Sequence, residues 1–249
     1  MLSHEERSIL RKNQLAEVIC QFRFPEILII GTNPPAQFQE LIRDVFPKYS
    51  VRKETSSPNQ AEVINHQFSS ADSRWRVNLT SKFISLSCHG YHCWEDFAQM
   101  LDKPLAAFIQ TYKPAYFERI GLRYLNFISR KSLDLDDVPF KELIHPCYLG
   151  PMAEDDVIES TIRRCTVDAQ FPLRGGCTLN IHAGPGMVKR NGIANEELHF
   201  IFDQDLFMAG NIPMNATTGA LNTLHRQAYS VFRGAITDTL FNAMEPYTC

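Results

Sequence analysis

The sequence predicts an α+β protein built on an antiparallel sheet, with the helices packed on one face of that sheet. Two observations lead to this class. Runs rich in β-branched and aromatic residues, typical of strands, alternate with segments whose apolar residues recur at i, i+3, i+4 and i+7, typical of amphipathic helices. The order strand, helix, three strands, long helix also occurs twice, which favours a pseudo-duplicated unit, although antiparallel sheets can repeat such an order by chance.

The first half covers residues 13–115. Its predicted elements are a strand at 14–24, a helix at 38–46, three strands at 61–68, 75–79 and 82–88, and a helix at 94–112. Asn33-Pro34-Pro35 offers a cap and prolines suited to a first helical turn, and Pro47 ends that helix. Pro104 is expected to kink or divide the second helix, because proline lacks a backbone donor and clashes with the preceding turn.

The second half covers residues 116–249 and repeats this order. Its predicted elements are a strand at 119–129, a short helix at 139–144, three strands at 158–171, 177–183 and 197–202, and a closing helix at 221–240. In the closing helix, Leu221, Leu224 and Ala228 begin an apolar side with helical spacing, and Pro246 follows its end. The clearest sequence similarity between the halves is that of QFRF, from Gln21, to LRYL, from Leu122.

We expect residues 1–249 to form a single compact unit, in which the halves 13–115 and 116–249 are fused on one sheet. The order of elements in each half is similar to the unit of helix-grip and TATA-binding-protein-like folds. A likeness of this kind implies a fold and not a function. It implies that a ligand would bind on the uncovered sheet face, or between the sheet and the long helix.

The charge balance argues against a dedicated nucleic-acid binder. The chain has 25 basic and 28 acidic residues, a net charge of −3, whereas nucleic-acid binders usually carry a basic excess or stripe. Nucleic acid is therefore not the favoured partner, although a local basic patch would suffice to bind it.

There is no apolar run of about 18 residues, so we expect no membrane span. The start of the chain lacks a secretory signal, so we expect a cytoplasmic protein with reduced cysteines.

Thiols and imidazoles are dense in the segment CHGYHC. Cys88, His89, His92 and Cys93 are the residue types that bind zinc. However, adjacent residues of an extended chain point to opposite sides, so the segment supplies two ligands at most. The favoured interpretation is a turn from strand to helix at Gly90, with no metal and no cofactor.

Glycine and basic residues are concentrated over 182–192. Gly184 and Gly186 would let the backbone approach a phosphate, and Lys189 and Arg190 would supply positive charge. The segment matches neither the P-loop nor the dinucleotide-binding pattern. We favour a long hairpin connection over an anion-binding loop.

Polar residues alternate with apolar ones along two neighbouring predicted strands. Arg164 and Asp168 share one face of the first strand with Thr166 and Gln170, and His182 lies on the second, together with Asn180. If the strands pair, Asp168 would come close to His182, as in a general acid–base couple. Asp203 and Asp205 would add carboxylates, although a turn at the end of their strand explains them equally well. The alternative is a solvent-facing side of a sheet, which we favour.

The sequence leaves enzymatic activity undecided and leans against it. It contains no nucleophile elbow, no HExxH pair, no kinase signature and no dinucleotide-binding fingerprint. Catalytic sites can be assembled without a local motif, so this absence lowers the expectation of an enzyme without removing it.

Five segments resemble a sporadically distributed family of uncharacterised prokaryotic proteins of about 250 residues. They are LAEVICQFRF at 15–24, PAQFQ at 35–39, Tyr91 with WEDF at 94–97, RIGLRYLN from Arg119 to Asn126, and Leu224-His225 with Phe232, Ile236 and Thr237. The resemblance extends from about residue 13 to about residue 245. It implies no catalytic residue, and the patchy distribution of such families suggests defence genes.

Together these observations predict a non-enzymatic binding or accessory protein of a prokaryotic cell, within a defence or toxin–antitoxin system. Its partner would be another protein, either a gene neighbour or a second copy of the chain. One alternative is an enzyme that acts on a phosphorylated ligand or nucleic acid through His182, Asp168 and Arg164. Another is a helix-grip carrier with an apolar cavity beneath residues 221–244.

Overall fold

The computed structural model describes residues 2–54, 62–190 and 193–247, and it confirms the predicted α+β class with an antiparallel sheet. Nine strands form the main sheet in the order β3-β4-β5-β6-β2-β7-β10-β9-β8. The chain divides into two compact units. One, which we name the α3 unit, comprises 17–122 and 207–222; the other, the α5 unit, comprises 1–16, 123–206 and 223–249.

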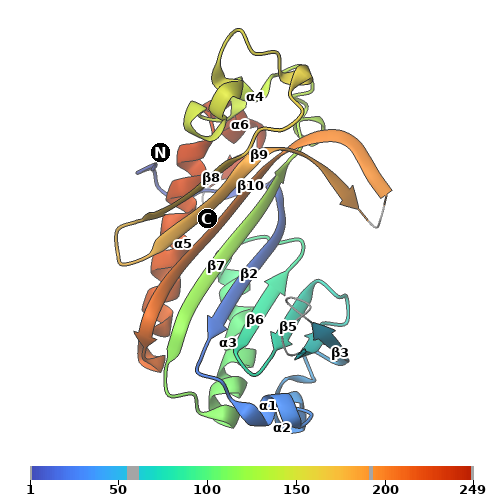
Figure 1. Ribbon diagram of the computed structural model, residues 1–249, viewed down its shortest axis with the longest axis vertical. Helices are drawn as coiled ribbons and strands as arrows, with labels where there is room; N and C mark the ends of the chain where they lie inside the picture. Colours follow the sequence, from blue (N-terminus) through green and yellow to red (C-terminus); the bar gives the residue numbers. More distant parts are fainter. Residues whose placement is uncertain (1, 55–61, 191–192, 248–249) are drawn as a thin grey trace. The chain divides into compact units, whose positions relative to one another are not determined.

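The α3 unit contains an antiparallel series of strands covered by one long helix (Figure 1). Its elements are β2 (Leu15–Arg23), α1 (Leu28–Thr32), α2 (Ala36–Ile42), β3 (Lys48–Glu54), β4 (Val63–Ser69), β5 (Trp75–Leu79), β6 (Phe83–Cys88) and α3 (Trp94–Tyr112). The strand predicted at 75–79 has the bounds of β5. Those predicted at 14–24, 61–68 and 82–88 correspond to β2, β4 and β6, with residue 61 outside the described residues.

Aromatic side chains fill the core between α3 and these strands. Phe97 and Phe108 are fully buried on the inner side of α3, and their rings lie 5.7 Å from Trp75 and 4.6 Å from Phe24, respectively. Such tilted pairs add to the free energy gained from burying the rings. The amphipathic spacing that predicted this helix therefore corresponds to its buried side.

Helix α3 continues through Pro104, so the prediction that this proline divides the helix is wrong. The proline removes one backbone hydrogen bond, which favours a break in an isolated helix. Here Pro104 is itself buried, with the buried Leu101 one turn before it and Phe108 one turn after. Packing on both sides of the proline holds the helical path.

The α5 unit contains the second series of strands and a long helix behind β8, β9 and β10 (Figure 1). Its elements are β1 (Ile9–Leu10), α4 (Phe140–Leu143), β8 (Val167–Pro172), β9 (Thr178–Arg190), α6 (Asp238–Ala243), β11 (Pro246–Tyr247), and most of α5 (Thr217–Ala235). Strands β7 (Phe117–Ile128) and β10 (Ile193–Ile212) contribute residues to both units.

Four predicted elements of this half need correction. Residues 158–171 do not form one strand: Glu159–Thr161 is a 3-10 helix and β8 begins at Val167. The strands predicted at 177–183 and 197–202 are much longer, as β9 and β10. The helix predicted at 221–240 ends at Ala235, because Ile236 leaves it to form a bridge with Ile144, and a second helix follows.

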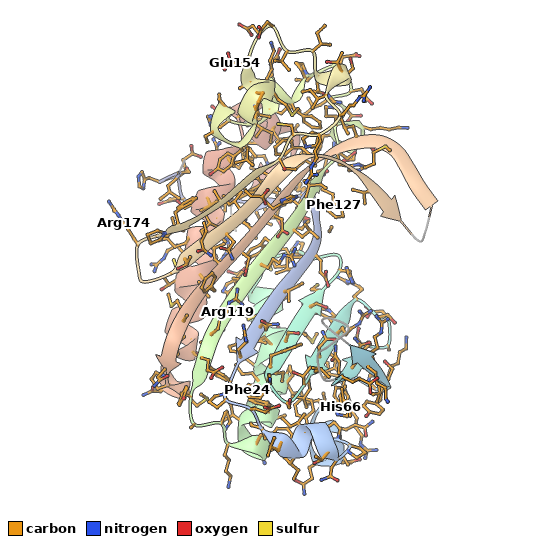
Figure 2. The ribbon with its side chains drawn as sticks, viewed as in Figure 1. Phe24, His66, Arg119, Phe127, Glu154 and Arg174 are labelled. Carbon is orange, nitrogen blue, oxygen red and sulfur yellow. The ribbon has the colours of Figure 1, made fainter. Side chains whose placement is uncertain are left out.

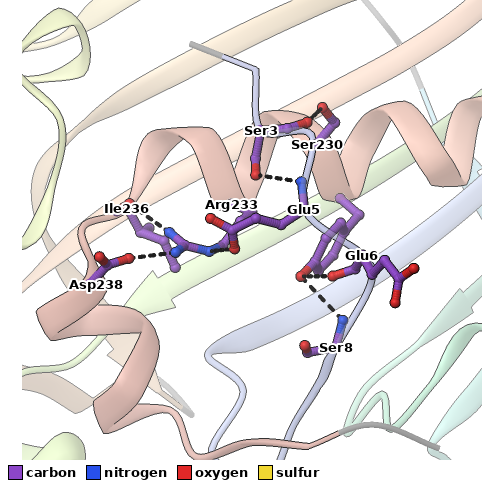
Figure 3. A network of polar contacts seen from close by, with 9 residues as sticks. Ser3, Glu5, Glu6, Ser8, Ser230, Arg233, Ile236 and Asp238 are labelled. Atoms are coloured by element: carbon purple, nitrogen blue, oxygen red, sulfur yellow. Dashed lines mark hydrogen bonds and ion pairs between the residues drawn. The ribbon is translucent and has the colours of Figure 1, made fainter.

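An N-terminal segment of the α5 unit lies along helix α5 and is bound to it by polar contacts (Figure 3). The Arg233 guanidinium donates to Glu5 Oε2 at 2.8 Å and also to Asp238, and its carbon lies 4.2 Å from the centre of the Phe241 ring. Ser3 accepts a hydrogen bond from the Ser230 hydroxyl. Arg233 is buried, so these contacts replace the hydration that its guanidinium loses on folding.

Among the described residues, no helix combines the length and the apolar character needed to cross a membrane.

Candidate binding face

Seven polar side chains form a row across four strands of the main sheet in the α5 unit, on the side turned away from α5. We name this row the ladder face; its members are Asp168 and Gln170 of β8, Asn180 and His182 of β9, Asp203 and Asp205 of β10, and Arg123 of β7.

Alternation along each strand places these side chains on one face. On β9, Leu179, Ile181 and Ala183 are buried, whereas Asn180 and His182 between them are not. The same pattern on β10 buries residues 202, 204 and 206 and leaves 203 and 205 partly accessible. Because successive side chains of a strand point to opposite faces, the apolar set packs beneath α5 and the polar set faces outward.

At the β8 end of the ladder face, His182 contacts Asp168. These residues are register partners on β9 and β8, and His182 Nδ1 lies 2.6 Å from Asp168 Oδ1. Their side chains are 47% and 67% exposed. Because the carboxylate binds the proton on Nδ1, the neutral ring keeps Nε2 as an acceptor directed away from Asp168.

The next register pair continues the row toward β10. Gln170 Nε2 donates to Asn180 Oδ1 at 2.7 Å, and Asn180 Nδ2 donates to Asp205 Oδ2 at 3.4 Å. Gln170 therefore uses its amide nitrogen within the row, and Asn180 uses both its amide oxygen and its amide nitrogen. The side chains are held in fixed orientations before any ligand arrives, which lowers the entropic cost of binding.

Arg123 and Asp203 end the row on β7 and β10. Arg123 Nε donates to Asp203 Oδ1 at 2.7 Å, and Arg123 Nη2 donates to Asp203 Oδ2. This forked arrangement fixes both side chains and neutralises one carboxylate. The sequence indicated Asp203 as an added carboxylate but gave Arg123 no role. Its only sequence signal is the alternation of residues along β7.

The chemistry of this face suits recognition better than catalysis. A histidine bonded to a carboxylate is the arrangement of a general base. Yet general bases gain their strength from sites that exclude water, and the His182–Asp168 pair is about half exposed. What the face offers is hydrogen-bond acceptors and negative charge in a fixed row.

The structure does not bring Arg164 into this row. The residue was expected to share a strand face with Asp168, but β8 begins only at Val167, and Arg164 is exposed in the preceding connection. Cys165, its neighbour, bonds through its thiol to the carbonyl of Leu149, which ties this stretch to the 3-10 segment before it.

The predicted hairpin connection with anion-binding potential is mostly strand. Gly184 and Gly186 lie within β9, which continues to Arg190. A Cβ on Gly184 would stand 2.2 Å from the carbonyl oxygen of Cys165, so this glycine serves a close approach of two backbones. It is not part of an open phosphate loop. The side chains of Lys189 and Arg190 lie outside the described part of the chain.

The four candidate metal ligands of CHGYHC do not all come together. Cys88 is fully buried at the end of β6, and burial raises the pKa of its thiol to about 11. His89 faces Glu17, with 3.7 Å between Nε2 and Oε1. By contrast His92 and Cys93 lie together with Asp96, which the sequence analysis did not include. Gly90 has φ +75°, which agrees with the predicted turn.

Fold and site together define an α+β protein that carries a preorganised polar row on an antiparallel sheet. No family model matches the chain, and no curated protein matches it either. The family resemblance seen in the sequence therefore stays a prediction, and the function must be argued from the ladder face itself.

Proposed function

We propose that the protein is a non-enzymatic binding module that engages another protein through the ladder face. The observation that carries this proposal is the row of fixed side chains from Asp168 to Asp205, exposed at its β8 end. Surfaces used for binding are often polar and already ordered in the free protein.

The charge of the row indicates the kind of partner. Asp203 is paired with the Arg123 guanidinium, whereas Asp168 is bonded to the His182 ring and Asp205 accepts a hydrogen bond from the Asn180 amide. A partner that presents lysine, arginine or backbone N–H donors would meet these carboxylates, and charge complementarity of this kind sets specificity and association rate.

The experiment is co-expression of the chain with the products of its neighbouring genes, followed by a measured affinity for any protein that co-purifies. The triple variant Asp168→Ala, His182→Ala, Asp205→Ala should weaken that affinity by at least about tenfold, equivalent to about 1.4 kcal/mol. A suitable control is Glu154→Ala, which removes an acid from the connection between α4 and β8 (Figure 2). Equal affinity of the triple variant and the control variant would refute the proposal.

An enzyme that acts on phosphorylated ligands or nucleic acid is the second candidate, favoured by the 2.6 Å contact of His182 with Asp168. It predicts hydrolysis of a phosphomonoester or phosphodiester that is lost in His182→Ala and retained in Glu154→Ala. Turnover that is the same in both variants would come from a contaminant and would count against this candidate.

A further inference from the structure

Three different metal-binding side chains converge where helix α3 begins. A ring nitrogen of His92, the thiol of Cys93 and a carboxylate oxygen of Asp96 all lie within 4.8 Å of one another. They come from a segment of five residues in the α3 unit, and none of them belongs to the ladder face. The group therefore raises a question that is separate from the proposed function.

Local backbone geometry brings the three together. Gly90 turns the chain after β6, and Cys93 is extended, with φ −144° and ψ 167°, immediately before the helix. The chain then coils, so Asp96 returns over the turn that carries His92 and Cys93. His92 and Asp96 are thus four residues apart and in contact, with 3.2 Å between Nδ1 and Oδ2.

The 3.2 Å between His92 Nδ1 and Asp96 Oδ2 is close to the distance between two ligands of a tetrahedrally coordinated ion. Nitrogen and oxygen ligands of zinc lie about 2.0–2.2 Å from the metal, which places two of them about 3.4 Å apart at the tetrahedral angle. The longer separations within the group fall within 4.8 Å, so rotation of the Cys93 and His92 side chains would close them.

From this convergence we infer that His92, Cys93 and Asp96 form a binding site for Zn²⁺, with water as the fourth ligand. The mixture of nitrogen, sulfur and oxygen donors excludes the hard cations Mg²⁺ and Ca²⁺, which take oxygen ligands. Three protein ligands with one open position is a common zinc arrangement. Cys88 and His89 are not members, since one is buried and the other faces Glu17.

The electrostatics of the helix end oppose the site. The beginning of a helix carries partial positive charge, which disfavours a cation there. Glu95 and Asp96 in the first turn counter this charge. Coordination by a thiolate and an imidazole contributes far more, since coordination by such ligands is enough to fold zinc-finger peptides.

The experiment is titration of the purified, reduced chain with Co²⁺, which replaces Zn²⁺ and reports its ligands by absorption. The wild-type protein should bind one equivalent, with a sulfur-to-cobalt charge-transfer band and the intense visible bands of a tetrahedral ion. Addition of Zn²⁺ should abolish both. Cys93→Ser should lose the charge-transfer band. His92→Ala and Asp96→Asn should each weaken binding by more than about tenfold, since loss of an outer partner alone typically costs 10–100-fold.

Matched variants separate this site from other thiols and from the ladder face. Cys147→Ser removes an exposed cysteine elsewhere in the chain and should leave the Co²⁺ spectrum unchanged. Asp168→Ala should do the same. His92 and Asp96 are exposed, so their variants should fold, which circular dichroism of the metal-free proteins will check. A charge-transfer band that persists in Cys93→Ser, or no band in the wild type, would overturn the inference.

Discussion

His182 and Asp168 lie directly opposite each other on β9 and β8, and the ring Nδ1 is 2.6 Å from the carboxylate Oδ1. The next pair in the same register, Gln170 with Asn180, is also hydrogen bonded. If β8 slipped by one residue against β9, one strand's polar side chains, either Asp168 and Gln170 or Asn180 and His182, would turn to the other face of the sheet. The two contacts and the burial of the alternate residues therefore specify the same register.

The first prediction concerns the tautomer of His182. In the wild type the carboxylate of Asp168 should hold the neutral ring with its proton on Nδ1, because that nitrogen faces the carboxylate. Asp168→Ala should release this constraint and increase the population of the Nε2-protonated form. Nitrogen-15 NMR of the ring would measure the change, with Glu154→Ala as a control. Because the pair is exposed, the free energy of unfolding should change by less than about 1 kcal/mol.

Elements whose burial follows from local sequence could be predicted closely. Strand β5 alternates buried Val77 and Leu79 with the more accessible Arg76 and Asn78, and its predicted bounds are correct. Strand β3 was missed for the opposite reason: every side chain from Lys48 to Lys53 is exposed, and only Tyr49 and Val51 alternate with polar residues, which is too short a pattern to mark a strand. That strand exists through its pairing with β4, which the sequence does not reveal.

The same distinction applies to the candidate sites. His182 and Asp168 lie in one hairpin, 14 residues apart, so alternation within two neighbouring strands sufficed to pair them. Arg123 and Asp203 are 80 residues apart and meet only because β7 lies next to β10. Asp96 was missed because the candidate ligands were sought only among residues 88–93, which were treated as an extended chain. The coiling of α3 is what returns its carboxylate to His92.

The second prediction compares two glycines. Gly184→Ala should destabilise the protein by more than about 2 kcal/mol, because the new Cβ would stand 2.2 Å from the backbone oxygen of Cys165, so β9 and the segment just before β8 would have to separate. Gly219→Ala is the control: this glycine lies in α5 with no neighbouring atom within 4 Å of the added Cβ. It should stabilise by up to about 1 kcal/mol through helix propensity. Urea denaturation would measure both, and equal effects would contradict the assignment of Gly184 to a close contact between two backbone segments.

The third prediction concerns the N-terminal segment bound to α5. The Arg233 side chain is 9% exposed and binds Glu5 and Asp238. Arg233→Ala should cost about 1–3 kcal/mol; the cost stays below that of most broken buried ion pairs because the two acids left behind are exposed. Proteolysis within residues 3–8 should also accelerate. Arg226→Ala, at an exposed position of the same helix, should change neither quantity. Unchanged cleavage in Arg233→Ala would show that the segment is held by other contacts.

The fourth prediction is a pH dependence from His66, which is buried in the α3 unit. Its Nε2 lies 3.1 Å from the carbonyl oxygen of Ile30 and its Nδ1 lies 2.9 Å from the hydroxyl of Tyr49, so the neutral ring has both nitrogens bonded. Burial lowers the pKa of His66 below its usual value of 6.5. Below about pH 6.5 the unfolded chain therefore binds a proton that the native protein does not bind. The free energy of unfolding should fall on acidification through this window, by at most about 1.4 kcal/mol per pH unit, and be unaffected by this group above it.

Denaturation between pH 5.5 and 7.5 would measure this effect apart from the carboxyl of Asp72, whose pKa is lowered by the Ser70 hydroxyl, and comparison with a His66 variant would separate it from the other seven histidines. His66→Gln keeps a donor for the Ile30 carbonyl and cannot be protonated, so its stability should lose most of the slope over this window. His4→Gln, at an exposed histidine, should retain the wild-type slope. If the slope were the same in His66→Gln as in the wild type, the native protein would bind the proton as readily as the unfolded chain, and His66 would not be held neutral by burial.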